Sequence, residues 1–127
     1  MKGAFLVSEE PNLADLVLAA LRAAGAEVTP DGVAQLRDQQ SRLFTVFAHP
    51  DPDSDWEWRH GPVRPAREGP QPDLDMSSAC WIECRWEEIF TAQVRALALA
   101  LPAASWVLDG DGVLWPAEDV DPARVRL

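Results

Sequence analysis

The chain has 127 residues, of which 47% are hydrophobic and 25% are charged, and these values fit one globular domain and exclude a disordered, collagen-like or coiled-coil chain. Eleven basic residues against 21 acidic ones give a net charge of −10, which disfavours nucleic acid and anionic membranes as partners and favours a basic protein. The longest apolar run, 96–104, is shorter than a membrane span and residues 1–17 lack the apolar core of a signal peptide, so we expect a cytoplasmic protein.

The start of the chain predicts a strand followed by a helix. Residues 3–7 are apolar and form a run short enough for a buried strand. Pro11 and Asn12 then open a helix over 13–24, in which apolar side chains recur at helical spacing. We expect Asn12 to cap this helix at its N-terminus and Gly25 to end it.

Residues 31–48 permit two interpretations. The β-formers of 42–48 and the loose alternation of 33–37 favour a hairpin that turns at the polar residues 38–41. The Gln, Leu, Arg and Ala residues of 31–42 favour a helix instead. We expect the hairpin.

A proline-rich, acidic segment follows at residues 49–75. It contains six of the 11 prolines, and because proline blocks helix interiors and strand ladders, we expect most of it to be irregular. The exception is 55–60, whose alternating sequence DWEWRH predicts an edge strand. A loop of this length is usually functional or disordered, and Trp56 and Trp58 argue against plain disorder.

Residues 77–85 predict a strand with two different faces. Alternation places Cys80, Ile82 and Cys84 toward the core and Trp81, Glu83 and Arg85 on the opposite side. Two cysteines at this spacing in a strand lie too far apart for a disulfide, and with no histidine nearby they form no zinc site. We expect two buried thiols that act as small apolar side chains.

A helix and a hairpin complete the predicted elements. The helix covers 86–101, and its second half is apolar on all sides, so we expect that half to be almost completely buried. Pro102 ends it. The two Asp-Gly pairs that follow predict a hairpin turn between strands 105–108 and 113–115.

The string WVLDGDGVLWP at 106–116 carries the most suggestive acidic pair. An apolar strand followed by Asp109 and Asp111 resembles the first motif of the haloacid dehalogenase superfamily, in which one aspartate attacks phosphate and the next acts as acid or base. That family needs a long downstream region with a phosphate-binding lysine, whereas 11 residues follow Pro116 and the sole lysine is Lys2. The string also fails the EF-hand pattern, whose fifth and twelfth positions would be valines here. We expect a turn.

Acidic residues and both histidines crowd the string HPDPDSDWEWRH at 49–60. An alternating Asp-Pro chain is extended and splays such side chains, whereas a metal site needs ligands that converge at fixed spacing. We therefore expect no metal and no cofactor. Since the sequence also has no nucleophile motif and no phosphate-binding glycine loop, we expect a protein that is not an enzyme.

Six tryptophans and no tyrosine are the most informative compositional excess. We expect two or three of them in the core. Others alternate with acidic residues, and an aromatic ring among carboxylates suits an interface with a basic protein, since the ring supplies burial energy and the charges supply steering. The predicted partner-binding surface consists of Asp51, Asp53, Asp55, Trp56, Glu57, Trp58, Trp81 and Glu83.

The second half of the chain contains a strand (SSACWIECRW), an Ala- and Leu-rich helix (EEIFTAQVRALALAL) and an Asp-Gly hairpin (SWVLDGDGVLWPAEDVDP). With the small size and acidity of the whole chain, this order resembles the immunity proteins of bacterial polymorphic-toxin and contact-dependent inhibition systems. The resemblance implies a cytoplasmic α+β protein that binds and neutralises a cognate toxin, often a basic nuclease. It transfers no functional residue, because it rests on no shared motif.

We therefore expect a single α+β domain over 1–127, with a mixed or antiparallel sheet of five or six strands and two helices packed on one face. The expected function is non-enzymatic neutralisation of a basic bacterial toxin. The alternative is an adaptor, a chaperone or a small subunit of a larger complex, in which apolar contacts dominate. An enzyme of an unfamiliar type is a third interpretation.

Overall fold

Strand β1 (Gly3–Ser8) lies at the centre of a mixed, eight-stranded sheet in this computed structural model, which describes residues 2–127. All six residues of β1 are buried, which explains the apolar run over its first five positions. β1 pairs antiparallel with β6 (Ser78–Cys84) on one side and with β7 (Ser105–Leu108) on the other. The centre of the sheet is thus built from strands that are far apart in the sequence.

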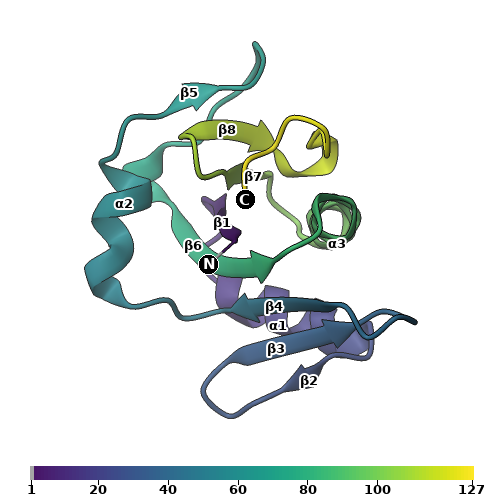
Figure 1. Cartoon of the computed structure of the whole chain (residues 1–127). Coiled ribbons are helices and arrows are strands. Elements are labelled where there is room, and N and C mark those ends of the chain that lie inside the picture. The colour runs from purple at the N-terminus through teal and green to yellow at the C-terminus, as the bar shows by residue number, and fades with distance from the viewer. Residues whose placement is uncertain (1) are drawn as a thin grey trace.

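The sheet continues on both sides of this centre in the order β2-β3-β4-β6-β1-β7-β8-β5 (Figure 1). The predicted hairpins are confirmed, one between β3 and β4 and one between β7 and β8. The predicted number of strands, five or six, is wrong, because the sheet has eight. β2 and β5 have only two residues each, too few to show an alternating pattern in the sequence. β5 runs parallel to β8. The outer strands are β2 (Glu27–Val28), β3 (Val33–Arg37), β4 (Leu43–Phe47), β5 (Arg64–Pro65) and β8 (Val113–Pro116).

The two predicted long helices, α1 (Leu13–Ala23) and α3 (Glu87–Ala100), pack on one face of the sheet. Each buries apolar residues three or four positions apart, which therefore lie on one side of the helix. These residues are Leu13, Val17 and Leu21 in α1 and Phe90, Val94 and Leu97 in α3. A short 3-10 helix, η3 (Ala117–Asp119), packs beside α3.

Two details of these helices differ from the predictions. Asn12 occupies the N-cap position of α1, but its side chain makes no capping hydrogen bond, and its backbone N–H donates to the Glu10 carboxylate over 3.2 Å. The second half of α3 is not buried throughout, because Leu99 lies on the side away from the sheet and is 75% exposed. Gly25 follows α1 as predicted, with the left-handed φ of +96° that favours glycine.

The opposite face of the sheet carries a second, smaller core centred on Trp58. This residue belongs to α2 (Asp55–Arg59), a helix where the sequence predicts an edge strand. The preceding turn explains the difference: the Asp51 carboxylate accepts a hydrogen bond from the Asp53 N–H, and Pro52 opens the 3-10 helix η1 (Pro52–Ser54) that leads into α2. Trp58 is 1% exposed and packs with Phe5, Val7, Trp106, Leu108 and Leu114.

Arg59 ties α2 to the end of the proline-rich segment. Its guanidinium lies 4.3 Å from the centre of the Trp58 ring and donates to the carbonyl oxygens of Leu74 (2.8 Å) and Asp75 (3.0 Å). Both acceptors belong to the 3-10 helix η2 (Leu74–Met76). Much of residues 49–75 is irregular, as predicted, and this arginine ties α2, in the middle of the segment, to its C-terminal end. In Figure 1, α2 lies to the left of β1 and α3 to its right.

Asp109 is a buried carboxylate at the turn between β7 and β8. Both of its oxygens accept two hydrogen bonds each, over 2.9–3.2 Å, from the N–H groups of Asp111, Val113, Trp115 and Arg126. Gly112 has a φ of +76°, a conformation that glycine adopts without strain. The predicted turn is confirmed, and its first residue also holds the C-terminal segment.

The two cysteines are free and buried, as predicted. Burial raises the pKa of the Cys80 thiol to about 12 and also raises the pKa of Cys84. Both therefore stay protonated near neutral pH and pack as apolar groups. Among residues 2–127, no helix has the length and apolar character needed to cross a membrane.

We expect Trp58→Ala to lower the free energy of unfolding by about 3–5 kcal/mol, because it empties the centre of the second core. Urea denaturation monitored by circular dichroism measures this change. Trp56→Ala is the matched control, since that indole is 64% exposed, and should change stability by less than about 0.5 kcal/mol. Equal effects of the two substitutions would show that Trp58 does not anchor α2.

Asp109→Asn should lower the free energy of unfolding by about 2–4 kcal/mol, because either orientation of the amide points N–H donors at two existing N–H donors. The same denaturation experiment measures the loss. Asp111→Asn is the control, since the Asp111 side chain is 57% exposed and pairs only with the exposed Arg126. A neutral Asp109→Asn would contradict the role assigned to this carboxylate.

Candidate functional site

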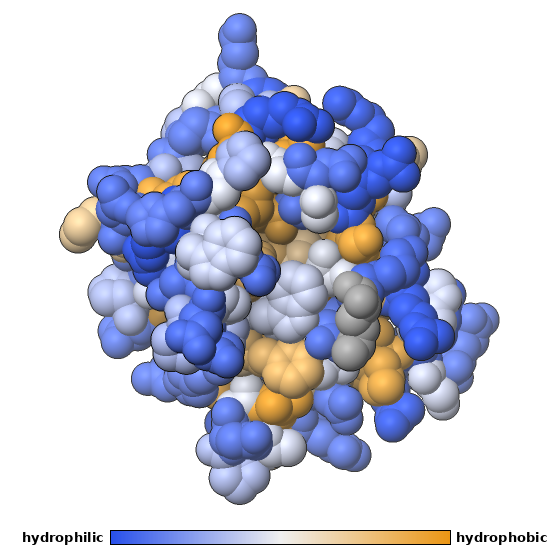
Figure 2. Space-filling model, turned by 60° about the vertical axis from the view of Figure 1, so that its left-hand side comes forward, coloured by the Kyte–Doolittle hydropathy of each residue, from blue (hydrophilic) through white to orange (hydrophobic). Residues whose placement is uncertain are grey.

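A groove crosses the face of the sheet that carries α2. It consists of two cavities of about 390 Å³ and 330 Å³, whose walls share Phe5, Glu57 and Trp81. Figure 2 shows this side of the molecule, where aromatic and apolar side chains form a floor bordered by hydrophilic residues. We call it the acidic–aromatic groove and define it by Phe5, Phe47, Asp51, Glu57, Trp81, Glu83 and Asp111.

The floor of the groove is a row of three aromatic side chains on neighbouring strands. Phe5 on β1 and Phe47 on β4 are both in register with Trp81 on the strand between them, β6. The rings of Phe5 and Trp81 meet edge to face, with centroids 4.8 Å apart and an interplanar angle of 60°. Strand alternation turns all three away from the core under α1 and α3.

Trp81 is held in place on two further sides. Its indole N–H donates to Glu83 Oε1 over 3.1 Å, which also fixes that carboxylate. Its ring lies against the backbone of Gly3, where an added Cβ would stand 2.7 Å from the ring atom Cζ2 and 2.3 Å from the Ile82 carbonyl oxygen. Position 3 therefore requires glycine, because a larger residue would collide with the Trp81 ring and the Ile82 carbonyl. The Trp81 indole and the Glu83 carboxylate are thus held in place by the chain itself.

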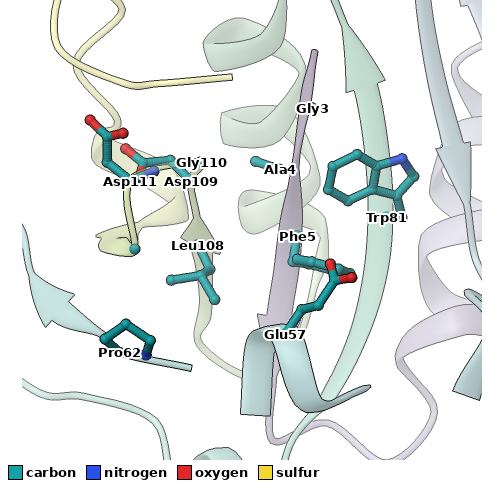
Figure 3. A pocket seen from close by; sticks show the side chains of 11 residues that line it. Gly3, Ala4, Phe5, Glu57, Pro62, Trp81, Leu108, Asp109, Gly110 and Asp111 are labelled. Carbon is teal, nitrogen blue, oxygen red and sulfur yellow. The ribbon is translucent and has the colours of Figure 1, made fainter. Parts of the chain in front are cut away.

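Carboxylates from four places in the fold border the floor: the start of η1, α2, β6 and the turn between β7 and β8. Figure 3 shows the first cavity, with Glu57 reaching from α2 toward Phe5 and with Asp111 at the opposite end beside Asp109. Asp51 and Glu83 line the second cavity. Among residues 2–127, the five ion pairs use other carboxylates than those of Asp51, Glu57 and Glu83. These three charges have no basic partner within the described chain.

The structure divides the eight predicted partner-binding residues into groups. Four of them line the groove, namely Asp51, Glu57, Trp81 and Glu83. Asp53 and Trp56 are exposed on η1 and α2. Asp55 pairs with Arg59 over 3.7 Å and lines a different cavity, of about 510 Å³.

Trp58 corrects the prediction. At 1% exposure it belongs to the core beneath the groove and offers no surface to a partner. Phe5, Phe47 and Asp111 are groove residues that the sequence reasoning missed. Their strands and turn were predicted, but no local pattern places them beside residues 51–57. That neighbourhood depends on the order of the strands.

The groove combines burial with negative charge. An apolar floor gains free energy when a partner covers it, and fixed carboxylates attract and orient cationic groups. Among residues 2–127, no three His, Cys, Asp or Glu side chains converge in a way that could hold a metal ion.

No family model, no curated protein and no solved structure matches the chain.

Proposed function

We propose that this protein is a non-enzymatic inhibitor of the immunity type, which binds a basic bacterial toxin through the acidic–aromatic groove and so neutralises it in the cytoplasm. The observation that carries the proposal is the row of Phe5, Trp81 and Phe47. It is bordered by the carboxylates of Asp51, Glu57 and Glu83, which have no basic partner within residues 2–127. The net charge of −10 supports a basic partner.

The chemistry of the groove selects the charge of the partner. A protein that covered the aromatic floor would also remove water from the carboxylates of Glu57 and Glu83. A buried charge without a counter-ion costs several kcal/mol, so an apolar partner would leave this cost uncompensated. A basic partner compensates it and is also steered toward the groove before contact.

An adaptor or a small subunit of a complex is the second candidate. Two apolar side chains outside the groove favour it, Leu99 on α3 at 75% exposure and Met76 in η2 at 70% exposure. Contacts through such residues survive high salt, whereas attraction between exposed charges weakens as the screening length falls from about 10 Å at 0.1 M to about 3 Å at 1 M. Salt dependence therefore separates the two candidates.

The first test captures partners from a lysate of the source organism with the chain tagged at its C-terminus, at about 0.1 M salt, where the screening length is about 10 Å. We expect one stoichiometric, basic protein whose toxic activity is lost in the complex and which high salt releases. A salt-resistant assembly, or a partner that keeps its activity when bound, would contradict the proposal.

A triple variant then tests two groove carboxylates, Glu57 and Asp111, together with Asp53, which lies between the cavity-lining residues Asp51 and Ser54. Asp53→Lys, Glu57→Lys and Asp111→Lys together should slow association with the captured partner by at least about tenfold, measured by surface plasmon resonance. These three carboxylates accept no hydrogen bond in the structure, so the fold should tolerate the change. The matched control carries Glu27→Lys, Glu88→Lys and Glu118→Lys, which alter the net charge equally on other surfaces. Equal effects of the two triple variants would assign binding to net charge and contradict a role for the groove.

A further inference from the structure

The second cavity of the groove has the composition of a binding site for a single cationic side chain. It measures about 330 Å³ and combines the aromatic floor with the carboxylates of Asp51, Glu57 and Glu83. His49 also lines it, but within residues 2–127 it forms no ion pair with these carboxylates. We call it the cation pocket. Because Trp81 and Glu83 are fixed by their mutual hydrogen bond, binding there would order few side chains.

Elsewhere the chain shows how its tryptophans pair with arginine, which makes up ten of its 11 basic residues. Three of them carry an arginine guanidinium 4.3–5.8 Å from the ring centroid, and the pairs are Arg42 with Trp86, Arg59 with Trp58, and Arg124 with Trp115. Trp81 is partly exposed, and no described arginine lies over it. Trp56 and Trp106 have no such arginine either, but Trp81 differs from them in lining a cavity with the carboxylates of Asp51, Glu57 and Glu83.

The surroundings favour arginine over lysine. A guanidinium is planar and weakly hydrated, so it stacks on an indole while its N–H groups bond to carboxylates at the edges of the ring. A lysine ammonium is compact and strongly hydrated, and an aromatic floor replaces its water poorly. The pocket offers both the indole surface and carboxylates from two sides, α2 and β6.

We infer that the cation pocket receives an arginine side chain of the partner protein, with the guanidinium over Trp81 and its N–H groups bonded to Glu57 and Glu83. This inference rests on the proposed function and adds the residue type that the groove recognises. It identifies the partner's contact surface as one that presents an exposed arginine.

The test is a nuclear magnetic resonance titration of the ¹⁵N-labelled chain with two peptides, acetyl-Gly-Arg-Gly-amide and acetyl-Gly-Lys-Gly-amide. The readout is the indole N–H signal of Trp81, assigned by its loss in Trp81→Phe. We expect a saturable shift with a dissociation constant at least about fivefold lower for the arginine peptide. The indole N–H of Trp115, which is bonded to Asp109, is the internal reference and should not move.

Two variants locate the binding site. Glu57→Gln and Glu83→Gln keep the size of the side chains and should each weaken arginine binding at least about threefold by removing a charge-assisted hydrogen bond. Glu88→Gln on α3 is the matched control and should leave it unchanged. Equal binding of both peptides, or no response of Trp81 to millimolar peptide, overturns the inference.

The outcome is separable from that of the proposed function. A captured basic partner that depends on the groove, combined with no response of Trp81 to the arginine peptide, would overturn the arginine assignment and leave the proposed function standing. A specific response to the arginine peptide, combined with a captured partner that ignores the groove variants, would support the cation pocket and overturn the proposed function.

Discussion

Burial of the Trp58 indole against the second face of the sheet determines where the acidic part of the chain lies. The central strand β1 is buried on both faces, so each face needs an apolar cover. Helices α1 and α3 cover one face, and on the other Trp58 does so from a helix of only five residues. Arg59 extends this anchor to η2. Successive residues of a helix are about 100° apart around its axis. Because Trp58 points toward the sheet, Trp56, two positions earlier, points to the other side of α2.

The groove follows from this anchor and from strand register. The order β4-β6-β1 brings Phe47, Trp81 and Phe5 into one row, and α2 places Glu57 beside that row. The carboxylates of Asp51, Glu57 and Glu83 have no counter-ion among residues 2–127, and like charges in one groove repel one another. Under the proposed function, their position around the aromatic floor serves to attract and orient a basic partner.

Local sequence patterns were sufficient for the long elements and insufficient for the site. Alternation correctly assigned the two faces of β6. The number of core tryptophans, three, agrees with the expectation, but one of them is Trp58, which the sequence placed on the partner-binding surface. The string DWEWRH predicts a strand and forms the helix α2 instead. Its alternation of tryptophans with charged residues is compatible with a short helix in which one tryptophan, Trp58, faces the sheet. Phe5, Phe47 and Asp111 were missed because their proximity depends on strand order, which pairs residues distant in the sequence and leaves no local signal.

Site-specific photo-crosslinking tests most directly whether a partner binds on the α2 side. Benzoylphenylalanine is placed at position 56, on α2 beside the groove, or at position 99, on the exposed side of α3. Both positions carry exposed side chains in the native chain, so the fold should tolerate either probe. We expect irradiation of the complex to join the basic partner to position 56 and not to position 99. An adduct at position 99 alone would contradict the account and favour an adaptor that binds through its helical face.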